Sequence, residues 1–133
     1  MIEELVSFGT AKLAKEKGFD LYCYNYWIDE NIQTDEHYKG KLIKELKDKC
    51  VSAPTQALLQ KWLREVYEID IIPHRTRPYD IVGRKHIKKY TCLFDGDNEG
   101  LIHLMNKVWG NTYEEALEKG LQEGLKLINY ENK

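Results

Sequence analysis

The sequence lacks most of the features that assign a protein to a class at first sight. Serine occurs only twice, as Ser7 and Ser52, and hydrophobic residues never form a run near the ~20 residues that a membrane span needs. The patterns GxSxG, GxGxxG and GxxxxGK(S/T) are absent. The common signatures of serine hydrolases, dinucleotide-binding proteins and P-loop NTPases are therefore excluded, and an enzyme is disfavoured.

Cysteine is also scarce. Cys23, Cys50 and Cys92 are odd in number, widely spaced and without a CxxC pair, which is typical of reduced, buried thiols in a cytosolic protein. The N-terminal stretch carries a charge every few residues and has no apolar signal-peptide region. We therefore expect a cytoplasmic protein that does not associate with a membrane.

Metal-binding patterns are equally sparse. The stretch DGDNEG, residues 95–100, begins like a calcium loop, but position 12 is Asn106 where such a loop needs a bidentate glutamate. An acidic turn is the better interpretation, and we predict no metal and no cofactor. None of the histidines has a partner at a zinc spacing; they are His37, His74, His86 and His103. A site built from His74, His86 and nearby carboxylates stays open as the basis of a small enzyme.

The composition that is present fits one globular domain spanning residues 1–133. Hydrophobic residues make up 42% and charged residues 32% of the chain, which is enough apolar material for a core without disulfides. The net charge of −2 gives no bulk attraction to nucleic acid. Nine tyrosines favour strands or a surface that meets a partner.

Three stretches have the apolar periodicity of helices: 7–17, 54–67 and 113–128. Ser7 is a suitable N-cap for the first of them, and Gly18 is placed to end it as a C′ glycine. Thr112 and Glu115 form a capping box for the third. Local signals thus predict where two of the three helices begin.

The middle helix contains the most regular stretch, APTQALLQKWLREVY. Ser52 can cap it and Thr55 can help, with Pro54 in the first turn, where its missing N–H has no cost. Its apolar face is broad and comprises Leu58, Leu59, Trp62, Leu63, Val66 and Tyr67. A face this wide predicts a helix that supports the core rather than a free recognition helix.

Strands are expected at 21–28, 69–74, 79–84 and 88–94, with less regular helices at 41–50 and 99–109 and a loop at 29–40. The strands cluster in the middle of the chain and the helices at its ends. This order predicts an α+β fold in which an antiparallel sheet of about three to four strands is covered by three or more helices.

The stretch from 74 to 89, HRTRPYDIVGRKHIKK, is strongly basic. Six basic residues stand against Asp80, a balance of +5; they are Arg75, Arg77, Arg84, Lys85, Lys88 and Lys89. A basic hairpin after a helix can contact a phosphate backbone, so these residues are candidates for nucleic-acid binding. Charge balance within the chain is the alternative, because residues 95–133 carry eight acids and four lysines.

Small residues recur at every fourth position of the last helix, as Ala116, Gly120 and Gly124. A glycine inside a soluble helix costs about 1 kcal/mol relative to alanine, so something should offset that cost. We expect close packing against an aromatic-rich sheet, with Tyr and Trp side chains filling the groove. A helix–helix contact in a homodimer is the alternative.

Three stretches, FGTAKLAKEKGF, SAPTQALLQKWLREVYEIDIIP and TYEEALEKGLQEGLKLI, resemble small uncharacterised phage and prophage proteins of Bacteroidetes. They cover about fifty of the 133 residues and leave out 29–51 and 79–111. The resemblance implies a phage-related origin and a product in the cytoplasm of the bacterial host, and it brings no activity, cofactor or catalytic residue.

The leading hypothesis is therefore a non-enzymatic accessory or interaction protein with an unknown protein partner. A nucleic-acid-binding protein that uses the basic stretch is the alternative, and a small enzyme with an unrecognised site is a weaker one.

Overall fold

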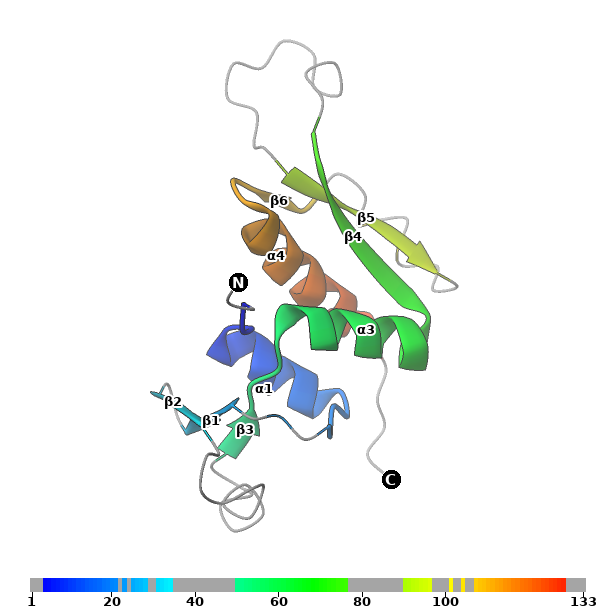
Figure 1. Ribbon diagram of the computed structural model, residues 1–133. Coiled ribbons are helices and arrows are strands. Elements are labelled where there is room, and N and C mark those ends of the chain that lie inside the picture. Colours follow the sequence, from blue (N-terminus) through cyan, green and yellow to red (C-terminus); the bar gives the residue numbers. More distant parts are fainter. Residues whose placement is uncertain are drawn as a thin grey trace.

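A computed structural model describes residues 4–21, 23, 25–28, 31–34, 50–76, 90–96, 101, 104 and 107–128. The helices are α1 (Phe8–Glu16), α3 (Gln56–Tyr67) and α4 (Tyr113–Lys126). The strands are β1 (Asn25–Ile28), β2 (Asn31–Thr34), β3 (Cys50–Ser52), β4 (Ile69–Arg75), β5 (Tyr90–Gly96) and β6 (Trp109–Gly110) (Figure 1). The predicted α+β class, with antiparallel strands and three helices, is confirmed.

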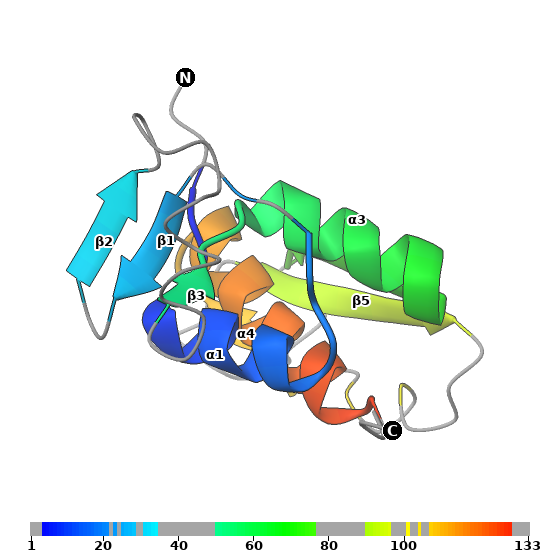
Figure 2. The same cartoon turned by 90° about the horizontal axis from the view of Figure 1, so that it is seen from below.

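The strands form two sheets rather than the single sheet that was expected. One sheet has the order β2-β1-β3 and the other the order β4-β5-β6, and both are antiparallel. Trp27 of β1 pairs with Ile32 on one side and Val51 on the other, so β1 has neighbours on both sides within its own sheet. Figure 2 shows this smaller sheet beside the N-terminal end of α1.

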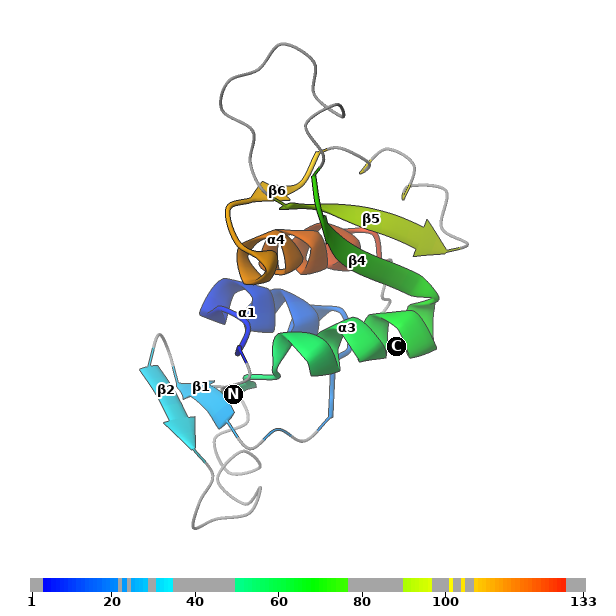
Figure 3. The ribbon, with the colours of Figure 1, turned by 45° about the horizontal axis from the view of Figure 1, so that its top comes forward.

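The larger sheet, the helices and the smaller sheet are arranged as successive layers (Figure 3). Helices α3 and α4 pack on β4, and α4 also packs on β5 and β6, while α1 contacts α4 and β3. Side chains of β4 and β5 alternate between buried and exposed, which directs Ile69, Ile71 and Phe94 into the core. Leu121 and Leu125 of α4 are fully buried in the same core.

The ends of α1 follow the local signals. The Ser7 hydroxyl accepts a hydrogen bond from the Thr10 N–H, as expected of an N-cap. At the other end Gly18 has a φ of 97°, and the Phe19 N–H donates to the Ala14 carbonyl at 2.9 Å. This is the Schellman arrangement, in which glycine adopts the left-handed conformation without steric cost.

The start of α3 agrees with the prediction in part, since Thr55 was expected only to assist Ser52. Thr55, not Ser52, is the N-cap, because its side chain accepts from the Leu58 N–H at 3.1 Å. Ser52 instead ends β3 and pairs with Tyr26. Both residues can cap a helix, and the pairing of β3 with β1 decides which of them does so. Within the broad apolar face of α3, Val66 is 56% exposed and does not join the core.

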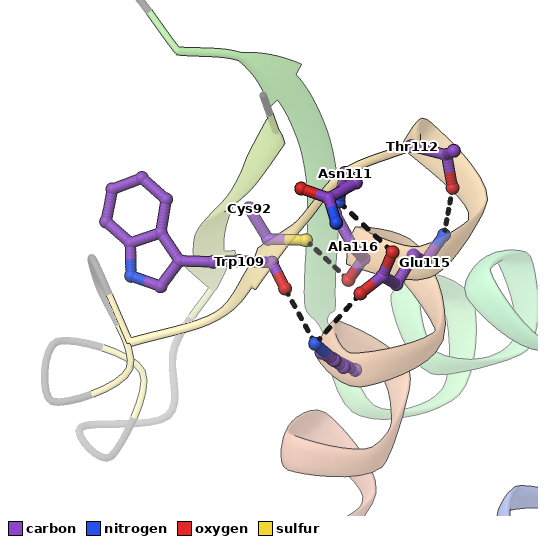
Figure 4. Close-up of polar contacts among 7 residues, drawn as sticks. Cys92, Trp109, Asn111, Thr112, Glu115 and Ala116 are labelled. Carbon is purple, nitrogen blue, oxygen red and sulfur yellow. Dashed lines mark hydrogen bonds and ion pairs between the residues drawn. The ribbon is translucent and has the colours of Figure 1, made fainter. Parts of the chain in front are cut away.

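At the start of α4 the predicted cap is present with one change. The Thr112 hydroxyl accepts from the Glu115 N–H at 3.1 Å, while the Glu115 carboxylate accepts from the Asn111 N–H rather than from that of Thr112 (Figure 4). Lys119 donates to the Glu115 carboxylate and to the Trp109 carbonyl, which joins α4 to β6.

Several other predicted elements are revised or lie outside the described residues. Strand β2 occupies part of the polar run that was expected to be a loop. Cys50 begins β3 instead of ending a helix, and Trp109 begins β6 instead of ending one. The polar run and the helical spacing indicate the wrong type of element here. Strand pairing with β1 and β5 supplies hydrogen bonds that a local sequence pattern does not reveal. Residues 41–49 and 79–89 are not among the described residues.

Candidate functional site

An open groove of about 890 Å³ lies among the N-terminal segment, the smaller sheet and the first turns of α4. We call it the acidic groove. Its apolar lining residues are Leu5, Val6, Trp27 and Ile32. Its polar lining residues are Glu4, Ser7, Gln56, Thr112, Glu114, Glu115, Glu118, Lys119 and Gln122.

Backbone hydrogen bonds hold the N-terminal segment in place as one wall of the groove. The Val6 N–H donates to the Pro54 carbonyl at 3.0 Å, and the Gln56 N–H donates to the Glu4 carbonyl at 2.8 Å. Leu5 forms an isolated antiparallel bridge with Thr55. Val6 is 1% exposed, so its side chain anchors the segment to the core.

Glu118 of α4 accepts hydrogen bonds from three residues in two distant parts of the chain. The Ser7 N–H and hydroxyl each donate to its Oε2 atom at 3.0 Å, and the Thr10 hydroxyl donates to the same atom. Gln56 donates to its Oε1 atom at 3.0 Å and to the Glu114 carbonyl at 2.9 Å. Donors from its own chain engage both carboxylate oxygens, so Glu118 ties α1, α3 and α4 together and is poorly placed to transfer a proton.

Two other carboxylates of the groove differ from that of Glu118 in having no such donors among the described residues. Glu4 and Glu114 are exposed, and no side-chain hydrogen bond or ion pair of theirs is found within the described part of the chain. Glu115 is engaged by Asn111 and by Lys119, the latter at 3.2 Å. The groove therefore carries a surplus of negative charge at its rim.

Trp27 and Ile32 form a cross-strand pair beside these charges. Ile32 is 42% exposed, and the Trp27 ring lies edge-to-face with Phe8 at 6.0 Å between centroids. The Trp27 Nε1 atom is buried and has no hydrogen-bond partner among the residues that the structure describes. A buried donor without an acceptor is uncommon in a folded protein and has a cost in stability.

Of the six basic candidates for nucleic-acid binding, the described residues include Arg75. Its guanidinium lies 5.8 Å from the centre of the Tyr90 ring and donates to the Tyr90 hydroxyl at 3.4 Å. This hydrogen bond raises the pKa of Arg75, which stays cationic. Tyr90 in turn lies edge-to-face with Tyr113. The other five lie outside the described residues; they are Arg77, Arg84, Lys85, Lys88 and Lys89.

Of the two histidines of the hypothetical enzyme site, the structure describes His74. His74 is exposed and its Nδ1 atom lies 3.3 Å from the Arg75 carbonyl oxygen. His37, His86 and His103 lie outside the described residues. Among the residues that the structure describes, no three His, Cys, Asp or Glu side chains gather in a way that would hold a metal ion.

Two of the cysteines are buried thiols. Burial raises the pKa of Cys23 to about 11 and that of Cys92 to about 12. The Cys92 thiol also donates to the Ala116 carbonyl at 3.2 Å (Figure 4). Since the thiolate is the reactive form, both groups are poor nucleophiles at neutral pH.

We expect these two thiols to resist alkylation in the native protein. Relative to a thiol with the ordinary pKa of 9.0, the Cys92 thiolate fraction is smaller by about 1000-fold, because the pKa differs by about three. A short iodoacetamide pulse at pH 7.5, followed by peptide mass spectrometry, should leave Cys23 and Cys92 unmodified and label them fully in urea. Labelling of either residue within the native pulse would contradict this.

The small residues of α4 lie against the larger sheet. Ala116, Gly120 and Gly124 are all buried. A Cβ atom at Gly120 would lie 2.8 Å from Cγ2 of Ile71 and 2.9 Å from Sγ of Cys92. At Gly124 it would lie 2.7 Å from Cδ1 of Ile71. Aliphatic and thiol side chains occupy this contact rather than the expected Tyr and Trp rings, and the stripe has no exposed surface for a second chain.

Alanine at Gly120 should therefore destabilise the protein, whereas the same change at Gly9 should stabilise it. At Gly9, in the first turn of α1, nothing lies within 4 Å of an added Cβ, so the helical preference of alanine contributes about 0.5 kcal/mol. At Gly120 overpacking outweighs that gain, and we expect a net loss of about 1–2 kcal/mol. Urea unfolding of the two variants checks this, and equal signs would contradict it.

The acidic groove was not foreseen from the sequence, because its residues come from distant parts of the chain and none belongs to a motif.

No described helix is long and apolar enough to cross a membrane. Comparison with protein-family models, curated proteins and solved structures finds no match to this chain.

Proposed function

We propose that this protein is a non-enzymatic interaction protein that binds a partner protein in the acidic groove. In keeping with the resemblance of its sequence, we further propose a phage-related origin and a role in the cytoplasm of a bacterial host. The observation that carries the proposal is that the acidic groove combines the exposed apolar side chain of Ile32 with the carboxylates of Glu4 and Glu114, which have no side-chain partner among the described residues.

The polar chemistry of the groove supports binding rather than catalysis. A general acid or base must be free to exchange a proton with a substrate. The Glu118 carboxylate instead accepts donors from Ser7, Thr10 and Gln56. Ile32, by contrast, is an exposed aliphatic side chain next to Trp27, and adjoining apolar side chains at the surface are typical of interaction sites.

A random peptide library presented to the purified protein tests this proposal. Ligands selected on the unchanged protein should lose at least about tenfold in affinity on Ile32→Lys, because a contact at the centre of an interface is lost. Leu93→Lys is the matched control: Leu93 is 41% exposed on a strand outside the groove. Loss of affinity that is equal in both variants, or no selected ligand that depends on Ile32, would refute the proposal.

Screening with hydrolase and nuclease substrates is the complementary experiment. We expect no turnover. Turnover that is lost on changing one residue of the groove would instead favour the small enzyme.

Nucleic-acid binding is kept as a second candidate because of a cluster where β4 ends and β5 begins, in which Arg75 and Tyr113 are exposed. Arg75 beside the rings of Tyr90 and Tyr113 combines a cation with aromatic surfaces, as single-stranded nucleic-acid sites often do. Fluorescence anisotropy with short duplex and single-stranded oligonucleotides at ~50 mM salt should then show binding that weakens steeply as salt is added. Absence of binding under these conditions rejects the candidate.

A further inference from the structure

The charge of the acidic groove indicates which kind of partner segment it accepts. Among the described residues, four carboxylates and one ammonium group line it, which leaves a surplus of three negative charges. Glu4 and Glu114 are the exposed members whose charge is not offset by a partner within the described residues. A cationic ligand is attracted to such a rim and an anionic one is repelled.

The apolar lining excludes a ligand that is only a cation. Ile32 and Trp27 lie beside the carboxylates, and their exposed surface is covered only by a ligand with apolar groups of its own. A bare metal ion needs several converging ligand atoms, and Glu4 and Glu114 belong to no such cluster among the described residues. The ligand must therefore present positive charge and apolar surface together.

The size of the groove favours a peptide over a smaller cation. A volume of about 890 Å³ is at the upper end of what one drug-sized molecule fills. A polypeptide segment fills such a volume and presents cationic and apolar side chains together, whereas a simple amine supplies charge alone.

We infer that the acidic groove binds a peptide segment of a partner protein in which lysine or arginine alternates with aliphatic or aromatic residues. This inference rests on the proposed function. The cations lie against Glu4 and Glu114, and the apolar side chains lie against Trp27 and Ile32.

The test uses a fluorescein-labelled peptide of Lys-Leu repeats and measures anisotropy. The same peptide with glutamate in place of lysine, a Lys-Ser repeat and spermine are the comparison ligands. We expect the Lys-Leu peptide to bind, the Glu-Leu peptide not to bind, and the Lys-Ser peptide and spermine to bind at least about tenfold more weakly, since they lack the apolar contact.

Variants of the groove identify the site. Replacing Glu4 and Glu114 together by glutamine should weaken the Lys-Leu peptide about five- to tenfold and reduce its salt dependence. Glu65→Gln, which removes the same kind of charge from an exposed site on α3 outside the groove, should leave affinity unchanged. An equal effect of Glu65→Gln and the double variant, or spermine binding as tight as the peptide, would overturn the inference.

Failure of the inference is distinguishable from failure of the proposed function. If library ligands depend on Ile32 but are neutral or acidic, the groove is a binding site and the inference about its ligand is wrong. If no library ligand depends on Ile32, the proposed function itself is wrong.

Discussion

Substituting alanine for Gly96 is expected to lower the free energy of unfolding by about 2–4 kcal/mol, because the backbone there admits no side chain. Gly96 has a φ of 146° at the end of β5, where it pairs with Ile69. A Cβ atom would lie 1.9 Å from the Glu68 carbonyl oxygen and 3.1 Å from Cδ1 of Leu101. Glu68 joins α3 to β4 with a left-handed φ of 55°, so the obstructing atom is backbone in a tight connection.

Urea unfolding monitored by circular dichroism measures this effect. The control is Gly9→Ala, the same chemical change at an exposed glycine with open space around it. If Gly96→Ala is as stable as the control, β5 does not approach the α3–β4 connection as closely as the structure places it. An unchanged m-value with a lower midpoint would show that stability, and not the extent of the folded core, has changed.

Substituting alanine for Trp62 is expected to cost about 3–5 kcal/mol, the usual range for removing a large buried aromatic side chain. Trp62 is 6% exposed in the middle of α3. Its ring lies edge-to-face with Phe19 and with Tyr67, in each case 5.2 Å between centroids. Edge-to-face pairs add to the burial term, and two of them are lost together in this variant.

Val66→Ala is the matched control on the same helix. Val66 belongs to the same apolar periodicity as Trp62, but it is 56% exposed, so its truncation should change stability by less than about 0.5 kcal/mol. Comparing the two variants shows whether stability depends on the burial of a side chain or only on its place in the apolar repeat. Similar losses for both variants would contradict the burial of Trp62 and the exposure of Val66.

The local features of the fold were predictable wherever the deciding contacts lie within a few residues. The Ser7 cap, the Gly18 terminus and the Thr112 cap each involve neighbours no more than five residues apart, and all three are present. For the cap of α3 the sequence offered both Ser52 and Thr55 and gave the main role to the wrong one, since the two residues have the same local chemistry and a strand pairing chooses between them.

The candidate site was far less accessible to sequence reasoning. Glu118 looks like an ordinary helix-surface residue in its own stretch. Its carboxylate accepts from Ser7 and Gln56, which lie 111 and 62 residues away in the sequence. The rim carboxylates of Glu4 and Glu114 come from opposite ends of the chain, and no periodicity relates them.

The sequence by itself therefore determined the α+β class, the three helices and most of their ends, because hydrogen bonds and apolar repeats over a few residues decide them. Only the tertiary structure decided that the strands divide into two sheets, that Gly120 meets Ile71 and Cys92, and that a groove forms beside α4. These features depend on contacts between distant segments, and such contacts are set by the packing of the whole core rather than by any local pattern.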